Sequence, residues 1–499
     1  MNAIRPGVVE GLGLQELLPG APANPRITGL TLDSRTVREG WLYAALPGSR
    51  AHGAQFAPAA VAAGAAAILT DADGARQLPD VSVPVVVADD LRARLGPVAS
   101  ALFGRPSEAL TMFGVTGTNG KTTTVALLEA GLMAAGRSVG TIGTIGFRMD
   151  GEAIESARST VTTPEAFDLH ALLATMRERG ADSVALEVSS HALEMERVGS
   201  IRFDVAAFLN LGHDHLDFHG TQSDYFEAKA RLFAPGVADA SVVWTDDEHG
   251  REIARRVRAH GSSRLITVGT GDADYVLSDA RPAGRLGAEA TVTRGGGSVR
   301  LELALPGFHN MIDGVVALAM LEAVGVGTDD ALAGLARAQV AGRMERAVLD
   351  DDAPLIIVDF AHTPQAVRGT LESLATLGPL TTVLGCGGDR DQAKRPAMGE
   401  AAAALSDLLI VTDDNPRTED PAASRAAVLE GAGGHRAEVT ETADRAEAIA
   451  EAIGRTGRDG VVAILGKGHE RGQILADRVV DFDDVAVARQ QWARLRGGT

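Results

Sequence analysis

Residues Gly114–Thr124 read GVTGTNGKTTT and decide the fold of the region around them. They lie between an apolar run, Thr111–Val115, that predicts a strand and a run, Thr122–Ala135, that predicts a helix. A glycine-rich turn from a strand into a helix is the context that a phosphate-binding loop requires. Lys121 can neutralise the β- and γ-phosphates, and the Thr122 hydroxyl can bind Mg²⁺. The first glycine, Gly114, stands one position earlier than in the strict pattern of such loops. We nevertheless expect the loop to bind a nucleoside triphosphate, with ATP as the expected nucleotide.

Strands and helices alternate on both sides of this loop, which predicts a parallel sheet covered by helices on both faces. Apolar runs predict strands at Ser138–Thr144, Ser183–Val188, Val205–Leu211 and Ser241–Thr245. The predicted helices of this region are Glu165–Arg179, Asp224–Phe233, Met311–Val324 and Asp329–Ala338. Residues 272–305 differ, because their short, alternating and glycine-rich pattern predicts a β-hairpin insertion.

A third region repeats the pattern from near Gly342. Its predicted strands and helices are Leu355–Val358, Pro364–Leu377, Thr381–Leu384, Pro396–Leu405, Leu408–Val411 and Val461–Leu465. Ahead of the central region, a predicted strand at Val83–Ala88 and a predicted helix at Leu91–Phe103 are followed by Gly104, Arg105 and Pro106, which end the helix. We therefore predict an α/β fold of three domains, at residues 1–107, 108–340 and 341–499.

The composition excludes several classes of protein. The net charge of −19 argues against nonspecific binding to nucleic acid, because such binding needs a basic surface. The one cysteine, Cys386, excludes an intramolecular disulfide, and we interpret it as a small structural residue. The N-terminus has no charged start followed by an apolar core, and the longest apolar stretch, near Ala59–Leu69, is too short to span a bilayer. We therefore expect a cytoplasmic protein that does not insert into a membrane.

Two other strands of the central region end in polar motifs. Glu187 is the first residue of the motif EVSSH, which follows a buried strand. A carboxylate at this place is a candidate Mg²⁺ ligand. Taken alone, however, the motif is more simply interpreted as an ordinary acidic residue at the end of a strand. The segment Asn210–His219 holds three histidines and two aspartates within seven residues. That grouping favours Mg²⁺ or phosphate chemistry, with a zinc site or an ordinary polar loop as alternatives.

In the third region, four loops that follow strands are rich in glycine and charge. They are DFAH at 359–362, GCGGDRD at 385–391, DDNPR at 413–417 and GKGHE at 466–470. Because ligands of parallel sheets gather in the loops at the carboxyl ends of the strands, these loops are a second candidate site.

Taken together, the motifs resemble those of the Mur ligases, ATP-dependent amide ligases of peptidoglycan precursor synthesis, over essentially the whole chain. The motifs that carry the resemblance are DSR at 33–35, the GTNGKTT loop, TTP at 162–164, EVSSHAL at 187–193, DHLDFHG at 214–220, GRME at 342–345, DFAHTP at 359–364, GCGGDRD, DDNPR and GKGHE. The chain looks like the members that add the third residue to UDP-N-acetylmuramoyl-L-alanyl-D-glutamate. The resemblance implies an N-terminal UDP-substrate-binding domain, a central P-loop ATP-binding domain and a C-terminal Rossmann-like domain that binds the amino acid.

The resemblance also implies the residues of each site. For ATP they are Gly117, Thr118, Asn119, Gly120, Lys121, Thr122 and Thr123, with Arg343, Asp359 and His362 of the third domain. For the UDP-substrate they are Ser34, Thr162, Thr163, Ser189 and Arg197. For diaminopimelate they are Arg390, Asp414, Asn415, Arg417, Gly466 and Glu470. The chain departs from the family pattern at Trp244, Asp313 and Phe360.

Two Mg²⁺ ions are also implied by the resemblance. Thr122 and Glu187 would bind one, and His215 would serve the other together with Lys229, carbamylated to N6-carboxylysine. The motif around Lys229 predicts only a surface lysine when it is read alone. Lys121, Glu187, His215 and Lys229 are thus the implied catalytic residues. In the implied reaction, the γ-phosphate of ATP passes to the D-glutamate γ-carboxylate, and an amine then attacks the acyl phosphate.

The sequence DNPR at 414–417 resembles the form that selects meso-2,6-diaminopimelate rather than L-lysine. Diaminopimelate carries a second carboxylate, which Arg417 can bind with a planar, two-pronged set of donors. Lysine would leave that guanidinium unpaired and would repel it. A monomer is expected, and three alternatives stay open: the same ligase acting on L-lysine, a folylpolyglutamate synthetase-like ligase, and a P-loop regulatory protein. The DSR region argues against the second alternative, and the charged loops of the third domain argue against the third.

Overall fold

The computed structural model of the chain describes residues 6, 9–48, 51–154, 162–212, 214–284, 286–348, 350, 352–389 and 391–497. The chain divides into two compact units. The first unit consists of Met1–Arg281, Glu289–Leu303 and Phe308–Ala338. The second consists of Gln339–Thr499 with two short segments, Pro282–Ala288 and Ala304–Gly307. The predicted domain borders at residues 107 and 340 stay predictions.

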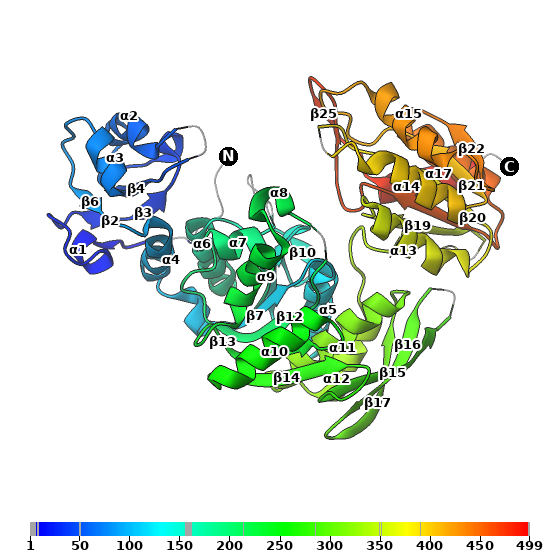
Figure 1. The fold of residues 1–499 in the computed structure, drawn as a ribbon, viewed down its shortest axis with the longest axis horizontal. Coiled ribbons are helices and arrows are strands. Elements are labelled where there is room, and N and C mark those ends of the chain that lie inside the picture. The colour runs from blue at the N-terminus through cyan, green and yellow to red at the C-terminus, as the bar shows by residue number, and fades with distance from the viewer. Residues whose placement is uncertain are drawn as a thin grey trace. The chain divides into compact units, whose positions relative to one another are not determined.

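The first unit begins with a small parallel sheet in the order β3-β4-β5-β6 (Figure 1). Its strands are β3 (Gly29–Thr31), β4 (Trp41–Ala45), β5 (Ala65–Thr70) and β6 (Val85–Val87). Every residue of β4 is buried, as expected for a strand that is covered on both faces. Leu42 of β4 joins one apolar core, whereas its neighbour Tyr43 joins another. Around the sheet lie β1 (Leu12–Gly13), β2 (Arg26–Ile27), α1 (Leu14–Leu17), α2 (Ala57–Ala62) and α3 (Ala72–Gln77).

Helix α4 (Leu91–Leu102) joins this sheet to the central region by packing against α6 (Ala166–Glu178). Phe167 of α6 enters the core of the N-terminal sheet, where its ring centre lies 4.9 Å from that of Phe103 and 5.8 Å from that of Trp41. On another face of α4, a Cβ atom at Gly96 would lie 2.3 Å from the carbonyl oxygen of Gly199. The N-terminal sheet and the central region therefore share one apolar core within the first unit.

The central sheet has the order β10-β9-β8-β11-β7-β12-β13-β14-β15-β16-β17 in the described residues (Figure 1). Its strands are β7 (Thr111–Thr116), β8 (Val139–Gly143), β9 (Gly146–Met149), β10 (Glu152–Ala153), β11 (Ser183–Glu187), β12 (Phe203–Phe208), β13 (Ala238–Trp244), β14 (Arg264–Gly269), β15 (Tyr275–Pro282), β16 (Ala288–Arg294) and β17 (Gly297–Leu303). From β8 to β15 neighbouring strands run parallel, and β9 and β10 add an antiparallel edge. The predicted parallel sheet is therefore confirmed as the centre of a mixed sheet.

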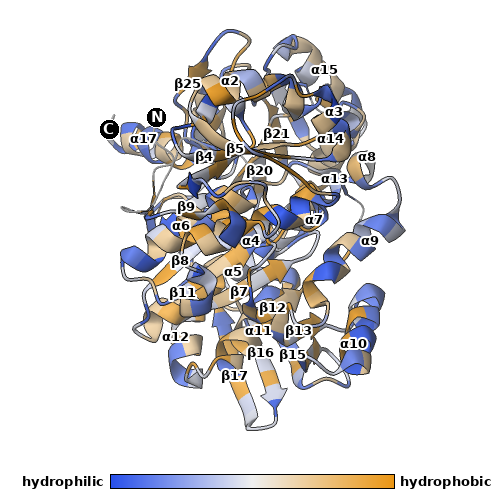
Figure 2. Cartoon of the chain, turned by 90° about the vertical axis from the view of Figure 1, so that its left-hand side faces the viewer, coloured by the Kyte–Doolittle hydropathy of each residue, from blue (hydrophilic) through white to orange (hydrophobic). Residues whose placement is uncertain are grey.

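Helices cover the central sheet, and most of them begin and end within a few residues of their predicted bounds. They are α5 (Lys121–Ala134), α7 (Ser190–Glu194), α8 (Leu216–His219), α9 (Gln222–Ala230), α10 (Glu248–His260), α11 (Phe308–Ala323) and α12 (Thr328–Arg337). The sequence did not predict α10, in which many charged residues surround the buried Ile253, Ala254 and Val257, so that the helix is mostly coloured hydrophilic in Figure 2. It also predicted a hairpin at residues 272–305, where the structure has three strands that extend the central sheet.

The second unit holds a sheet in the order β18-β19-β23-β20-β21-β22, parallel except for the edge strand β18. Its strands are β18 (Glu345–Arg346), β19 (Leu355–Asp359), β20 (Leu380–Leu384), β21 (Leu408–Val411), β22 (Glu438–Glu441) and β23 (Val461–Leu465). A separate antiparallel pair, β24 (Gln473–Ile474) and β25 (Val479–Val480), follows. The four predicted strands of this region correspond to β19, β20, β21 and β23, and they form the middle of the sheet.

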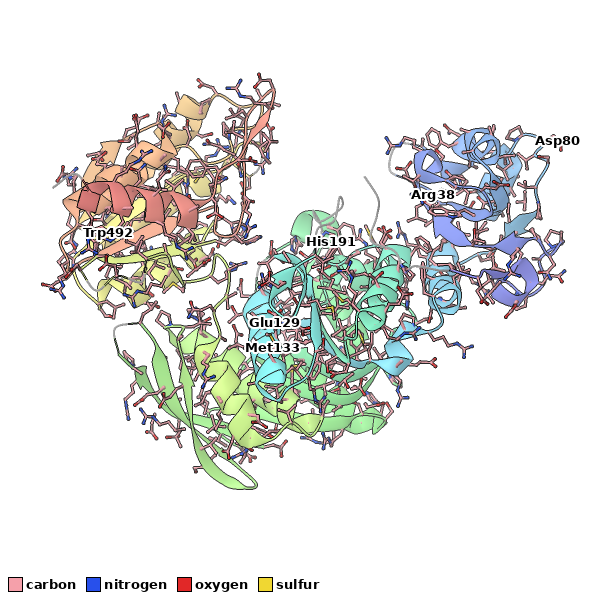
Figure 3. The ribbon with its side chains drawn as sticks, turned by 180° about the vertical axis from the view of Figure 1, so that it is seen from behind. Arg38, Asp80, Glu129, Met133, His191 and Trp492 are labelled. Atoms are coloured by element: carbon pink, nitrogen blue, oxygen red, sulfur yellow. The ribbon has the colours of Figure 1, made fainter. Side chains whose placement is uncertain are left out.

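The helices of the second unit are α13 (Pro364–Ala375), α14 (Lys394–Leu405), α15 (Pro421–Ala432), α16 (Arg445–Arg455) and α17 (Asp484–Gly497). The last three were not predicted. A fully buried ion pair between Arg445 and Asp484, at 2.7 Å, joins α16 to α17. Trp492 of α17 (Figure 3) donates its indole N–H to Asp350 at 3.0 Å. In the part of the chain that the structure describes, no helix is long and apolar enough to cross a membrane.

Candidate active site

The phosphate-binding loop runs from the end of β7 to Lys121, the first residue of α5. Gly120 has φ +88°, and a Cβ atom there would lie 2.3 Å from Asp313 Oδ1. Glycine is therefore needed both for the backbone conformation and for the space. Lys121 Nζ donates to the carbonyl oxygens of Gly117 at 2.7 Å and of Thr118 at 2.9 Å. The ammonium group thus lies at the N-terminal end of a helix, a place that favours anions.

Hydrogen bonds connect this loop to the loop that follows β12. The backbone N–H groups of Thr118 and Asn119 donate to Asn210 O at 3.1 Å and to Asn210 Oδ1 at 3.0 Å. Gly212 N donates to Thr118 Oγ1 at 2.8 Å, and that hydroxyl shares a 3.0 Å hydrogen bond with the Tyr225 hydroxyl. Two motifs that are far apart in the sequence therefore form one connected surface. Thr122 and Thr123 are buried in the first turn of α5.

Lys229 of α9 is only 1% exposed, so the simple prediction of a surface lysine is wrong. Its Nζ donates to Gly117 O at 2.9 Å, the same carbonyl that accepts from Lys121. The Nζ atom also lies 4.5 Å from the centre of the Tyr225 ring. Burial, and then repulsion from Lys121, hold the pKa of Lys229 well below its usual range. A lysine with a lowered pKa is available as the neutral, nucleophilic amine.

Glu187 is the last residue of β11 and is fully buried. It stands opposite Val115 of β7, one strand from the phosphate-binding loop. Its Oε1 accepts from the backbone N–H of Thr144 and its Oε2 from the Thr144 hydroxyl, both at 2.9 Å. Because a buried carboxylate needs such partners, the two hydrogen bonds fix its orientation at the carboxyl end of the sheet.

His215 has φ +55°, and its side chain is about half exposed. Its Nε2 lies 3.3 Å from Asp214 Oδ2, and its ring centre lies 4.8 Å from that of His191 (labelled in Figure 3) and 6.2 Å from that of Tyr225. His213 of the same motif lies outside the described residues. Among the described residues, no three His, Cys, Asp or Glu side chains form a metal-binding group. A threonine hydroxyl and a carbamylated lysine are ligands of other kinds, so the two Mg²⁺ sites stay predictions.

Three of the predicted UDP-substrate residues gather at the end of β11. Thr163 Oγ1 donates to Glu187 O at 2.8 Å, and it accepts from the backbone N–H of Ser189 at 3.1 Å. Arg197 Nη1 donates to Thr163 O at 3.0 Å, and its Nη2 pairs with Glu165 at 2.9 Å. A hydrogen bond to the carbonyl oxygen of Glu187 therefore connects these predicted substrate residues to a predicted metal ligand.

The other two predicted substrate residues lie in different places. The Thr162 hydroxyl shares a 3.2 Å hydrogen bond with the Thr144 hydroxyl, beside Glu187. Ser34 lies in the 3-10 helix Ser34–Thr36, just after β3 of the N-terminal sheet. It thus stands at the carboxyl edge of that small parallel sheet, where ligands of such sheets gather.

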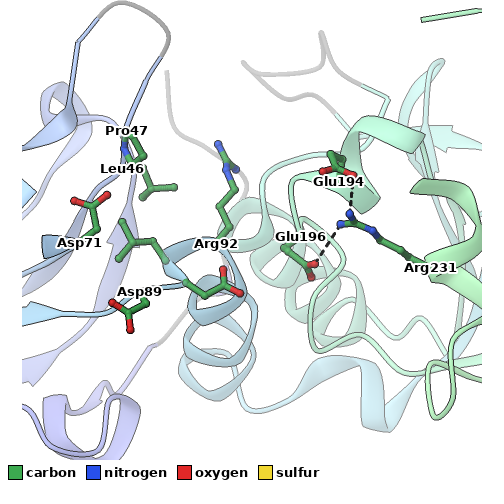
Figure 4. A pocket seen from close by; sticks show the side chains of 10 residues that line it. Leu46, Pro47, Asp71, Asp89, Arg92, Glu194, Glu196 and Arg231 are labelled. Carbon is green, nitrogen blue, oxygen red and sulfur yellow. Dashed lines mark ion pairs between the residues drawn. The ribbon is translucent and has the colours of Figure 1, made fainter. Parts of the chain in front are cut away.

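A pocket of about 330 Å³ opens between the N-terminal sheet and the central region of the first unit (Figure 4). Five carboxylates and two guanidinium groups line it, so its lining is negative and unsuited to a diphosphate. Arg231, one of the two basic residues, is paired with Glu194 at 2.8 Å and with Glu196 at 3.7 Å. None of the predicted UDP-substrate residues lines this pocket. Its lining residues are Leu46, Pro47, Asp71, Asp89, Asp90, Leu91, Arg92, Glu194, Glu196 and Arg231.

In the second unit, the predicted nucleotide residues surround Phe360. Asp359, at the end of β19, accepts from the backbone N–H groups of Ala361 at 2.9 Å and Met344 at 2.8 Å. The guanidinium of Arg343 lies 4.8 Å from the Phe360 ring centre, and His362 Nδ1 is 2.8 Å from Phe360 O. Arg343, Asp359 and His362 thus form one group, although they come from two separate motifs, GRME and DFAHTP.

The predicted diaminopimelate residues also come together in the second unit, apart from Arg390, which lies outside the described residues. Asn415 Nδ2 donates to Glu470 Oε2 at 2.7 Å and so connects the DDNPR loop to the GKGHE loop. Asp414 is 6% exposed, and its Oδ1 has no hydrogen-bond partner among the described residues. Gly466 has φ +112°, and a Cβ atom there would lie 2.8 Å from Asp414 Oδ2. The buried Asp414 carboxylate and the Glu470 carboxylate therefore belong to two loops that Asn415 connects.

Arg417 has φ +52°, a left-handed conformation that is uncommon for a residue other than glycine. Its backbone N–H donates to Ile474 O at 3.0 Å, and its Nη1 donates to Gly388 O at 2.6 Å. One end of the guanidinium is thereby anchored, and the group lies within the same cluster of loops as Asp414 and Glu470. The cluster offers both cationic donors and anionic acceptors.

Sequence reasoning missed Lys467, which is fully buried between these loops. Its position inside GKGHE, between two residues that were singled out, was the available signal. It also missed Thr144 and Tyr225, which no motif marks and which act only through contacts that the fold creates. Cys386 is buried, and burial raises the pKa of its thiol to about 12, in agreement with its structural interpretation.

Three family models match the chain. The model described as "Mur ligase family, catalytic domain" matches residues 26–102, "Mur ligase middle domain" matches residues 115–321, and "Mur ligase, glutamate ligase domain" matches residues 342–468. The three-domain α/β architecture predicted from the sequence is therefore confirmed. Solved structures of Mycobacterium tuberculosis folylpolyglutamate synthase share this fold, with a TM-score of 0.61, 20% identity, and coverage of 81% of this chain and 95% of that one.

Relatives that are more similar in sequence than folylpolyglutamate synthase are named as diaminopimelate-adding ligases. A Streptomyces coelicolor protein named UDP-N-acetylmuramoyl-L-alanyl-D-glutamate–2,6-diaminopimelate ligase is 44% identical over 483 residues, which cover 94% of this chain and 93% of that one. The Corynebacterium glutamicum protein of the same name is 44% identical over 497 residues, covering 96% and 94%. A solved structure of a ligase of that name has a TM-score of 0.71 and 31% identity, covering 97% of this chain and 99% of that one. The matching models and these nearly full-length similarities show that the chain belongs to the Mur ligase family.

Proposed function

We propose that this chain is an ATP-dependent ligase that joins meso-2,6-diaminopimelate to the D-glutamate γ-carboxylate of UDP-N-acetylmuramoyl-L-alanyl-D-glutamate in peptidoglycan precursor synthesis. The names of the relatives support this reaction. The observation that carries it is the cluster of the DDNPR and GKGHE loops, in which Asn415 donates to Glu470 and the Arg417 guanidinium is anchored on the carbonyl oxygen of Gly388. Such a set can bind the carboxylate and the ammonium of one zwitterionic centre at the same time. We further propose that the chain works as a cytoplasmic monomer with domains at 1–107, 108–340 and 341–499.

ATP is the proposed phosphoryl donor. Lys121 and the backbone N–H groups of the loop bind its phosphates, and the α5 N-terminus adds its positive dipole end. In the second unit, Arg343, Asp359 and His362 are the proposed nucleotide residues. The γ-phosphate passes to the substrate carboxylate, so that a carboxylate oxygen forms the new bond to phosphorus and ADP leaves. The amine of diaminopimelate then attacks the acyl carbon, loses a proton and expels phosphate.

Mg²⁺ fits the groups that the first unit provides. Glu187 is buried with an orientation fixed by Thr144, and the Thr122 hydroxyl lies in the first turn of α5, so both are hard oxygen donors of the kind that Mg²⁺ prefers. When bound, Mg²⁺ would offset the repulsion between the triphosphate and the substrate carboxylate. His215 and a carbamylated Lys229 are the proposed residues for a second ion.

Carbamylation of Lys229 is supported by its burial and by its lowered pKa, because the neutral amine is the form that adds to CO₂. The nitrogen forms a bond to carbon and releases a proton, and the product is a carboxylate at the end of the side chain. This change places an anionic oxygen ligand next to the Lys121 ammonium.

The UDP-substrate is proposed to use Ser34 at its uridine diphosphate end. Thr162, Thr163, Ser189 and Arg197 are proposed for the muramoyl part. Their contacts with Thr144 and with the backbone of Glu187 support this assignment, because they tie the substrate residues to a predicted metal ligand. The proposed metal and phosphate groups are therefore close to where these residues would hold the substrate.

The test is an assay of ADP release with purified chain, ATP, Mg²⁺ and the UDP-dipeptide, to which meso-diaminopimelate or L-lysine is added. We expect turnover with diaminopimelate to exceed turnover with lysine by at least about 100-fold, since lysine leaves a guanidinium unpaired. A preference for lysine would favour the second candidate, the lysine-adding ligase. ADP release that is independent of the UDP-dipeptide would contradict both.

A further inference from the structure

Lysine is rare in this chain, and its few positions are informative. The chain has only four lysines, Lys121, Lys229, Lys394 and Lys467, among its 47 lysine and arginine residues. Arginine is therefore the ordinary basic residue of this protein, and a buried lysine offers a compact ammonium in place of a planar guanidinium. Lys121 and Lys229 belong to the proposed phosphate and metal chemistry. Lys467 is fully buried in the other unit and has no role in the reaction as described so far.

The Lys467 ammonium lies where two loops meet, the DDNPR loop and the loop that joins β23 to β24. It donates to Asn415 Oδ1 at 2.9 Å and to the carbonyl oxygen of Gly472 at 2.6 Å. Two carboxylates are also near, with Asp414 Oδ1 at 3.5 Å and Glu470 Oε2 at 3.7 Å. An ammonium has three N–H donors in a compact group, which suits this crowded place better than a planar guanidinium.

These contacts fix the orientation of the Asn415 amide. Its Oδ1 accepts from Lys467 and from the backbone N–H of Ile474, both at 2.9 Å, so that both lone pairs are used. The Nδ2 group is consequently directed at Glu470 Oε2, at 2.7 Å. The Glu470 carboxylate is therefore held in place by an amide that Lys467 helps to orient.

The same ammonium also holds the segment that supports Arg417. Lys467 binds Gly472 O, and two residues later Ile474 O accepts the backbone N–H of Arg417 at 3.0 Å. Arg417 has a left-handed backbone that needs such external support. The anionic and the cationic sides of the proposed amino-acid site thus depend on one buried cation.

We propose that Lys467 is the positioning residue of the amino-acid site. It orients Glu470 through Asn415, and it supports Arg417 through the 472–474 segment. Glu470 then binds the ammonium, and Arg417 the carboxylate, of the distal zwitterion of diaminopimelate. This inference rests on the proposed function and adds a residue that fixes the positions of Glu470 and Arg417. Lys467 itself touches no substrate. Its positive charge lies between two carboxylates and lets them stay close together without repelling each other.

The test is steady-state kinetics of Lys467→Met in the full-length chain, with Arg455→Met as the control that removes an exposed positive charge from α16 of the same unit. We expect the KM for meso-diaminopimelate to rise about 10- to 100-fold, which is typical when a hydrogen bond to a charged group is lost. The KM values for ATP and for the UDP-dipeptide should stay within about twofold of wild type, as should kcat at saturating diaminopimelate. Arg455→Met should leave all these values unchanged.

A double-mutant cycle separates positioning from a general structural effect. If Lys467 acts through Asn415, then Lys467→Met adds little, less than about threefold, to the KM of Asn415→Ala. The proposal would be overturned if the KM increase of the double variant equalled the product of the two single increases. An unchanged KM for diaminopimelate in Lys467→Met would also overturn it.

If Lys467→Met does not fold, Lys467→Gln keeps a donor and carries the same test. A KM increase of about 10-fold for diaminopimelate alone is expected there, and equal KM increases for all three substrates would contradict the proposal. A wild-type chain that does not use diaminopimelate would overturn the proposed function together with this inference. A wild-type chain that uses it, with a Lys467→Met variant that does so equally well, would overturn this inference alone.

Discussion

Replacement of Lys229 by alanine tests the proposed carbamate most directly. Lys229 and Lys121 donate to the same carbonyl oxygen, that of Gly117, at 2.9 and 2.7 Å, so the two nitrogens are no more than about 5.6 Å apart. With an effective dielectric constant of about 20, two positive charges at that distance repel each other by about 3 kcal/mol. A carbamate on Lys229 reverses the sign, so the repulsion becomes an attraction of about the same size. The site therefore favours the carbamate over the ammonium.

Loss of this carboxylate should slow phosphoryl transfer markedly. For Lys229→Ala we expect kcat to fall about 10²- to 10³-fold, the range found when one group that stabilises developing charge is removed. Acetate or propionate should restore part of the rate, because a short carboxylate can occupy the space that the side chain leaves. Lys121→Ala is the matched control, since it removes an ammonium and should not respond to carboxylates.

Nuclear magnetic resonance with ¹³C-labelled bicarbonate reports the modification independently of activity. Wild type should show a carbamate carbon signal that is missing in Lys229→Ala. A near-normal rate for Lys229→Ala without added carboxylate would refute the reasoning, and so would a wild-type chain that is active without the carbamate signal.

Other substitutions test the remaining parts of the proposed site. Lys121→Ala should abolish detectable turnover in the ADP-release assay, because its ammonium is the charge that faces the β- and γ-phosphates, and appreciable activity would contradict that role. Arg417→Lys keeps the charge but loses the two-pronged donor set, so the KM for diaminopimelate should rise about 10- to 100-fold, and an equal rise for the UDP-dipeptide would count against the assignment. Gly466→Ala places a Cβ atom 2.8 Å from Asp414 Oδ2 at a φ of +112°, so calorimetry should show a loss of stability of about 1–2 kcal/mol together with weaker use of diaminopimelate. An unchanged melting temperature would contradict this reading of Gly466.

The sequence predicted the parallel centres of both large sheets because their strands are continuous apolar runs, such as Val461–Leu465. It did not predict α10, where charged residues interrupt the apolar face, or α16, whose Arg445 is buried only because Asp484 of α17 pairs with it. Pairing between distant segments leaves no local pattern. Helix α10 has buried residues four apart, Ile253 and Val257, which was a usable signal.

For the candidate site, the sequence identified the loops but not their connections. Strand-end motifs predicted that Asn415 and Glu470 lie near each other, and the structure brings them into hydrogen-bond contact. The burial of Lys229 could not be predicted from its helix, because the Gly117 carbonyl that it contacts is more than 100 residues earlier in the chain.

The insertion of Phe167 between Phe103 and Trp41 has a consequence for how such a chain can evolve. A helix of the central region completes the interior of the N-terminal sheet, and the residue just before that helix, Glu165, is also the partner of Arg197. Exchange of the first hundred residues with those of a relative would therefore change the surroundings of α6 and, through Glu165, of a proposed substrate residue. We expect recombinants to keep their function only when α4 and α6 are inherited as a pair.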